Sequence, residues 1–157
     1  MTPAELIRYL VLAAQREGNR QLGHALRALG LTPAQSEVLR ILGEHEPLTL
    51  GGIGELLVCE SGSNPSRLVD RLVSAGLVER VASADDRRQV TLTLSPEGKL
   101  AESRVRDIEA ALYARIDAAL VGVDAGPVLE LLGRLSAGEP AGEALANRLA
   151  ATEAADR

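Results

Sequence analysis

The fold is decided by one stretch of sequence, SNPSRLVDRLVSAGLVERVASADDRRQV, which spans residues 63–90 and continues as TLTLSPEG. From Ser63 to Gly76, a helical spacing of 100° per residue gathers the apolar side chains on one face, namely Leu68, Val69, Leu72 and Val73. Two strand patterns follow, Leu77 to Val81 and Gln89 to Leu94, and apolar residues alternate with polar ones in the second. The stretch therefore predicts an amphipathic helix followed by a two-stranded β-ribbon.

The polar face of this helix has the composition of a DNA-reading surface. A helix of this size fits the major groove of duplex DNA, and its candidate contact residues are Ser63, Asn64, Pro65, Ser66, Arg67 and Arg71. Arg67 can pair with guanine through two hydrogen bonds, and Arg71, one turn later, can bind phosphate. The simpler alternative is an ordinary solvated face on which Asp70 pairs with Arg67 or Arg71.

The turn between the two strands carries a second set of candidate DNA contacts, Asp86, Arg87 and Arg88. Arg88 is the strongest single candidate in the chain. A guanidinium at the tip of such a ribbon can enter the minor groove, where narrow A·T-rich sequence concentrates negative potential. The alternative interpretation is that these charges only solubilise a hairpin turn.

The charge of the chain favours specific over indiscriminate DNA binding. The 157 residues carry a formal net charge of −5, whereas residues 63–90 hold five arginines against four acidic residues, so this stretch is +1 and the remainder −6. An acidic body is not expected to coat nucleic acid nonspecifically. With two Tyr and no Phe or Trp, the chain also has almost no side chains for stacking on single-stranded bases.

Helices are predicted on both sides of this stretch. Thr2-Pro3-Ala4-Glu5 and Thr32-Pro33-Ala34-Gln35 are start signals for helices that end near Gly30 and Gly43. Ser95 caps a long helix that continues to about Leu120. The sequence therefore predicts a mostly α-helical chain with one small β-element.

The remaining segments have weaker signals. Leu48 to Leu50 is a short strand candidate, and Gly51 to Val58 is a glycine-rich helix that only tertiary packing could hold. A further helix is predicted over Val128 to Leu135. For the Ala/Glu-rich tail after Gly138, a loose helix and disorder both stay open.

Three strings in this order resemble the MarR family of winged-helix transcription regulators. They are LTPAQSEVLRIL (residues 31–42), SRLVDRLVSAGLVER (residues 66–80) and DDRRQVTLTLSPEG (residues 85–98). The last resembles the wing pattern of the family through Asp86, Arg88 and Leu94, with Ser95 in place of the usual Thr. In that pattern the aspartate orients the wing arginine.

The resemblance implies an obligate homodimer whose terminal helices interleave. The expected organisation is an N-terminal dimerisation helix over residues 1–30, a winged helix-turn-helix over 31–95, C-terminal dimerisation helices over 96–136 and the tail over 137–157. Many relatives repress genes until a small aromatic or phenolic acid, or an oxidant, weakens binding. The candidate ligand cations are Arg16, Arg20 and His24, with plain surface or interface charges as the alternative.

Catalytic, metal and cofactor sites are not predicted. Ser61, Ser63 and Ser66 lack the setting of a nucleophile, and the two histidines and one cysteine have no metal-ligand spacing. Cys59 lies outside the N-terminal helix, where oxidant-sensing relatives usually carry their cysteine, and it is interpreted as a small, partly buried apolar residue. The polar N-terminus and the lack of a long apolar run predict a cytoplasmic protein without a membrane partner.

The sequence therefore predicts a dimeric, ligand-responsive repressor that binds double-stranded DNA at a pseudo-palindrome. One alternative is a winged-helix module that binds another polypeptide, which the near-neutral charge of residues 63–90 keeps open. A second is a helical bundle that binds or converts a small molecule. Loss of duplex binding on Arg88→Ala would separate the first two.

Overall fold

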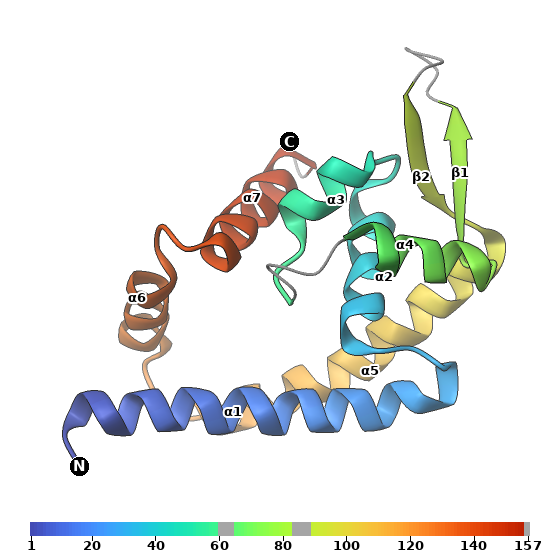
Figure 1. The fold of residues 1–157 in the computed structure, drawn as a ribbon. Coiled ribbons are helices and arrows are strands. Elements are labelled where there is room, and N and C mark those ends of the chain that lie inside the picture. Colours follow the sequence, from blue (N-terminus) through green and yellow to red (C-terminus); the bar gives the residue numbers. More distant parts are fainter. Residues whose placement is uncertain (60–64, 83–88, 156–157) are drawn as a thin grey trace.

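A computed structural model describes residues 1–59, 65–82 and 89–155, and Figure 1 shows its path. The described residues form a mostly helical fold with one two-stranded sheet, as predicted. Its elements are α1 (Pro3–Leu26), the 3-10 helix η1 (Arg27–Leu29), α2 (Pro33–His45), α3 (Leu50–Leu56), α4 (Pro65–Ser74), β1 (Val78–Ala82), β2 (Val90–Leu94), α5 (Pro96–Leu120), α6 (Ala125–Ser136) and α7 (Pro140–Ala155).

The predicted helix starts are confirmed. Thr2 and Thr32 each form a capping box. The threonine hydroxyl accepts a hydrogen bond from the backbone amide of the third helical residue, and the side chain of that third residue accepts one from the backbone amide of the threonine. Gly30 follows η1 with a φ of +66°, a conformation that glycine adopts without strain. Helix α2 runs past the predicted end near Gly43, because the Glu46 amide still donates to the Leu42 carbonyl oxygen at 2.9 Å.

The core forms where α2 meets α4 and α5. The α2 side chains Val38, Leu39, Ile41 and Leu42 are all fully buried. Helix α4 faces them with the apolar side predicted for it, since Leu68, Val69 and Leu72 are buried. Gly76 then ends the helix with a φ of +74°, and its carbonyl oxygen accepts a hydrogen bond from Ser95 Oγ at 2.6 Å.

The wing is an antiparallel ribbon whose register pairs Val78 with Leu94 at its base and Ala82 with Val90 at its outer end. The alternation predicted for β2 holds at Leu92 and Leu94, which are buried, whereas Val90 is half exposed because the outer ribbon extends beyond the core. The strand predicted at Leu48 to Leu50 is wrong except for one bridge between Leu48 and Leu92. Thr49 already caps α3, so the chain turns into a helix after a single paired residue.

Helix α3 forms despite its three glycines. Thr49 Oγ1 accepts from the Gly52 amide at 3.0 Å, and the apolar side chains of Ile53 and Leu56 are buried against the core. The tail after Gly138 is a helix rather than a disordered segment. Figure 1 shows this helix, α7, beside α3, and Ala144 is buried in the chain.

Helices α1 and α6 extend largely outside this core, although Leu26 near the end of α1 is fully buried in it. Figure 1 shows α1 as a long helix with α5 crossing it, and these two helices are in contact. Many large apolar side chains on α1 and α6 are exposed, including Leu6, Tyr9, Leu10, Val11, Leu12, Val128, Leu129, Leu131, Leu132 and Leu135. Along the described residues, every helix is too short or too polar to cross a bilayer.

Candidate nucleic-acid interface

Helix α4 places part of the predicted DNA-reading set on the surface. Arg67 and Arg71 are exposed on the side of the helix opposite to its buried leucines and valine, and Pro65 and Ser66 are half-buried in its first turn. Ser63 and Asn64, predicted to precede them, lie outside the described residues. The described part of α4 thus presents two guanidinium groups on a rigid, core-anchored helix.

The wing rises next to α4 (Figure 1). Val81 and Val90 near its outer end are about half exposed, and the Thr91 hydroxyl donates to the Val81 carbonyl oxygen at 3.3 Å. The predicted minor-groove residues Asp86, Arg87 and Arg88 lie outside the described residues. What the structure supplies is the ribbon that carries them.

An ion pair that the sequence did not suggest connects the wing to α4. Arg80 Nη2 of β1 donates to Asp70 Oδ1 of α4 at 2.5 Å, and both side chains are about half exposed. Among the described residues, Asp70 therefore pairs with Arg80 rather than with Arg67 or Arg71. In the sequence, Arg80 is only an arginine within a predicted strand. No nearby residue indicates that this strand returns beside α4.

A hollow of about 300 Å³ opens between α1, α2 and α4. Its lining residues include Asn19 of α1, Cys59 and Arg71 of α4. The predicted ligand cations Arg16, Arg20 and His24 are exposed on α1 and are not among the described residues that line the hollow. Arg20 instead pairs with Glu17 at 2.5 Å, and this hydrogen bond lowers the pKa of Glu17 to about 2.

Cys59 is exposed, not partly buried as predicted, because the chain leaves the core after Leu57. Desolvation and the neighbouring Glu37 carboxylate raise the pKa of the Cys59 thiol to about 12, so the protonated form dominates near neutral pH.

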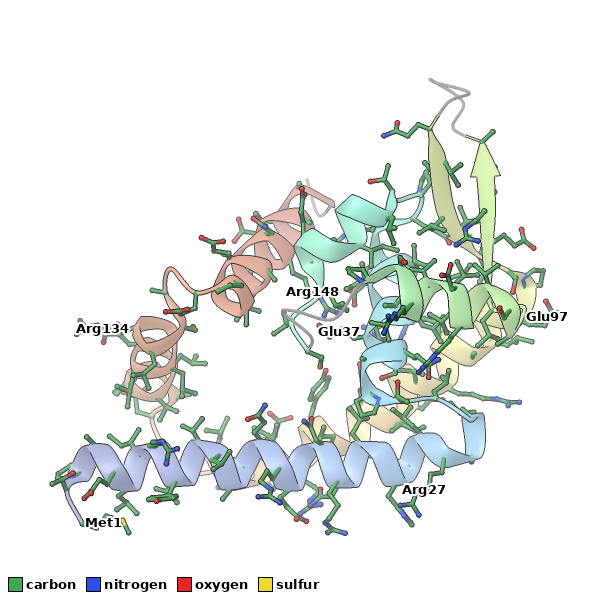
Figure 2. All side chains as sticks on the ribbon, viewed as in Figure 1. Met1, Arg27, Glu37, Glu97, Arg134 and Arg148 are labelled. Carbon is green, nitrogen blue, oxygen red and sulfur yellow. The ribbon has the colours of Figure 1, made fainter. Side chains whose placement is uncertain are left out.

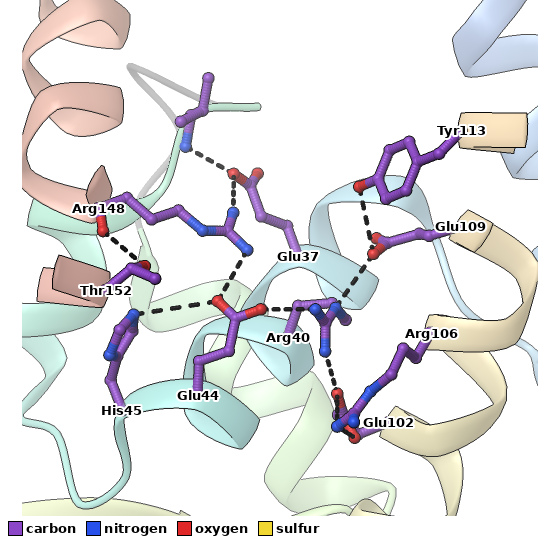
Figure 3. Close-up of polar contacts among 11 residues, drawn as sticks. Glu37, Arg40, Glu44, His45, Glu102, Arg106, Glu109, Tyr113, Arg148 and Thr152 are labelled. Carbon is purple, nitrogen blue, oxygen red and sulfur yellow. Dashed lines mark hydrogen bonds and ion pairs between the residues drawn. The ribbon is translucent and has the colours of Figure 1, made fainter. Parts of the chain in front are cut away.

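A polar network joins α2, α5 and α7 (Figure 3). Arg40 of α2 contacts three carboxylates: Glu44 at 2.5 Å, Glu109 at 3.0 Å and Glu102. Arg148 of α7 bridges Glu44 at 3.2 Å and Glu37 at 3.6 Å. Burial raises the pKa of Glu109, an effect that Arg40 opposes.

This network holds helices together and has no catalytic arrangement that we can identify. Each of its carboxylates is paired with an arginine, and the Glu102 side chain is only 6% exposed. In the part of the chain that the structure describes, no three histidine, cysteine or carboxylate side chains gather as metal ligands.

The comparisons with known proteins agree with this geometry. Residues 29–89 match a sequence model described as MarR family. The chain is 34% identical over 100 residues to an organic hydroperoxide resistance transcriptional regulator of Bacillus subtilis (strain 168). That alignment covers 64% of this chain and 67% of the regulator.

Solved structures with the same fold include the reduced form of MarR from E. coli and the transcriptional repressor CouR bound to a 23-mer DNA duplex. MarR is 25% identical with a TM-score of 0.61, over 87% of this chain and 95% of MarR. CouR is 26% identical with a TM-score of 0.66, over 85% of this chain and 92% of CouR.

Proposed function

Because this chain belongs to the MarR family and is therefore a DNA-binding transcriptional regulator, we propose that it acts as a homodimeric repressor on a pseudo-palindromic operator. Each subunit would insert α4 into a major-groove half-site, with Arg67 at base edges and Arg71 at phosphate. Arg88, with Asp86 and Arg87 beside it, would enter the neighbouring minor groove. The amphipathic α4, with both arginines outside and its leucines in the core, carries this proposal.

The prediction that the chain is not an enzyme is confirmed by its family, because the relatives are transcriptional regulators. The alternative of a winged helix that binds only other polypeptides loses its support for the same reason.

The exposed apolar surface supports a second copy of the chain as partner. Ile7 and Val11 of α1 and Leu131 and Leu135 of α6 line an apolar groove of about 480 Å³. Together with the apolar side chains exposed elsewhere on α1 and α6, this groove makes a patch larger than single surface leucines explain. We assign it to helices of the partner subunit.

Repression is supported by a relative, and release by a small acid is supported by a hollow. CouR, with 26% identity, is a transcriptional repressor. The hollow between α1 and α4 is lined by Arg71, so an aromatic or phenolic carboxylate bound there would compete with DNA phosphate for one guanidinium. Arg16, Arg20 and His24 stay a prediction for the same ligand. The acid releases DNA only if it binds the DNA-free protein more tightly than the DNA-bound protein.

The test begins with selection of duplexes from random DNA by the purified protein. Fluorescence anisotropy then compares the selected duplex with a scrambled duplex, for the wild type and for Arg67→Ala and Arg88→Ala. We expect both variants to bind at least about fivefold more weakly, because a good bidentate base contact by Arg67 contributes on the order of 1–3 kcal/mol and Arg88→Ala removes the proposed minor-groove cation. Arg134→Ala, an exposed arginine of α6, is the matched control. A wild type without duplex preference at low salt would overturn the proposal.

A further inference from the structure

Glu37 of α2 is a buried carboxylate that bonds to the chain just before the recognition helix. Its Oε1 accepts from the Val58 amide and its Oε2 from the Cys59 amide, both at 2.8 Å. The residue is 7% exposed. The backbone is extended at Leu57, so these two amides lie beyond the end of α3, and Glu37 supplies their acceptors.

The two-oxygen contact fixes the direction in which the chain leaves α3. A carboxylate that receives one amide on each oxygen restrains both peptide planes, and such charge-assisted bonds are stronger than neutral ones. Cys59 lines the same hollow as Leu68 and Arg71 of α4. The turn that Glu37 holds therefore lies beside the recognition helix.

Arg148 of α7 completes the arrangement from the other end of the chain. Its Nη1 lies 3.6 Å from Glu37 Oε1, and its Nη2 lies 3.2 Å from Glu44 Oε2. Figure 2 labels Glu37 and Arg148 in the whole chain, and Figure 3 draws the contact between their side chains. Asn147 Nδ2 of the same helix donates to the Glu55 carbonyl oxygen of α3 at 3.2 Å. Helix α7 is thus joined by polar contacts to both helices that precede the turn.

We propose that Glu37 is a positioning residue for the recognition helix and that Arg148 makes the C-terminal helix α7 a determinant of operator affinity. Neither side chain needs to touch DNA. This inference rests on the proposed function, because it assigns a role in the same DNA contact. We call the Glu37 carboxylate, the Val58 and Cys59 amides and Arg148 the Glu37 clamp. Because α7 directly follows α6 in the chain, this clamp also links the proposed dimer surface to α4.

The variants are chosen to keep the fold. Glu37→Gln is nearly isosteric but loses one acceptor and the charge, Arg148→Ala removes the α7 contact, and Arg148→Lys keeps the charge. Arg134→Ala removes an exposed ion pair with Glu130 on α6 and serves as the matched control. Circular dichroism first establishes that each variant is folded at the assay temperature.

Two measurements then test the clamp. In the free protein, amide hydrogen exchange at Val58 and Cys59 is expected to rise at least about tenfold in Glu37→Gln. With the selected duplex, affinity is expected to fall about tenfold in Glu37→Gln and about threefold in Arg148→Ala, with recovery in Arg148→Lys. The salt dependence of binding should keep the wild-type slope, because no phosphate contact is removed. The double variant should bind no more weakly than Glu37→Gln alone.

Other outcomes overturn the inference. If folded Glu37→Gln binds the selected duplex with an affinity within twofold of the wild type, the clamp has only a structural role. If this variant binds the duplex more tightly than the wild type, Glu37 merely repels phosphate. Additive losses in the double variant would separate Arg148 from Glu37. A wild-type protein that binds no duplex would contradict the proposed function instead. Unchanged amide exchange in the free Glu37→Gln protein would contradict the clamp even then.

Discussion

Arg80 of β1 and Asp70 of α4 form an ion pair at 2.5 Å that ties the wing to the recognition helix. Both side chains are about half exposed, so solvent screens the pair and its contribution to stability is small, below about 1 kcal/mol. Its position matters more than its strength, because it places one carboxylate on the face that the two exposed α4 arginines share.

Asp70→Asn should therefore strengthen DNA binding at low salt, by about twofold to fivefold, because a carboxylate near the phosphates is removed. The gain should fade as salt rises, and the melting temperature should barely move. Anisotropy titrations at several NaCl concentrations measure this. Weaker binding at low salt would instead mean that Asp70 serves by orienting Arg80.

Leu72→Ala should lower the stability of the fold, whereas Arg67→Ala should weaken DNA binding. Leu72 is fully buried, so its truncation should lower the free energy of unfolding by roughly 2–5 kcal/mol. Arg67 is exposed on the same helix, so Arg67→Ala should leave stability within about 0.5 kcal/mol and weaken operator binding. Urea denaturation and anisotropy measure the two quantities. Equal loss of stability in both variants would contradict the assignment of the two faces of α4.

Arg40→Ala should destabilise the fold strongly, by about 3–5 kcal/mol, because it leaves Glu109 largely buried without its cation and leaves Glu102 with Arg106 alone. The loss should depend on pH. Without Arg40 the pKa of Glu109 rises further in the folded state, so the penalty is full at high pH and shrinks as pH falls and this carboxylate binds a proton. Urea denaturation of wild type and variant between pH 8 and pH 5 gives the difference. A difference that grows toward pH 5 would contradict this account.

The thiol of Cys59 should react slowly with iodoacetamide at neutral pH although the residue is exposed. With a pKa of about 12, the thiolate fraction should rise about tenfold per pH unit up to that value. Glu37→Gln should lower the pKa and speed alkylation, since the carboxylate raises it. The chain has one cysteine, so mass spectrometry follows the reaction directly. A rate profile that levels off near pH 9 in the wild type would refute the assignment.

Leu135→Glu should convert the proposed dimer to monomers, because it puts a charge into the apolar groove between α1 and α6. Leu100→Glu is the control, since Leu100 is 67% exposed on α5 and does not line that groove. Light scattering coupled to size exclusion gives the masses. Monomeric wild type would contradict the dimer, and a dimeric Leu135→Glu would place its interface elsewhere.

The sequence by itself determined the elements that depend on neighbours within a turn or two. The capping boxes at Thr2 and Thr32, the apolar face of α4 and the glycine stop at Gly76 are local hydrogen bonds, periodicities and backbone preferences. These act over a few residues, so their signals survive in one sequence without any knowledge of the fold.

Only the tertiary structure decided which distant side chains meet. Asp70 faces Arg80 because the wing returns beside α4, and Glu37 meets the Val58 and Cys59 amides and Arg148 because α3 and α7 pack around α2. Exposure of Cys59 and the docking of α7 on α3 were decided in the same way. Such contacts depend on chain reversals and on burial, which place residues side by side with no regular spacing between them in the sequence.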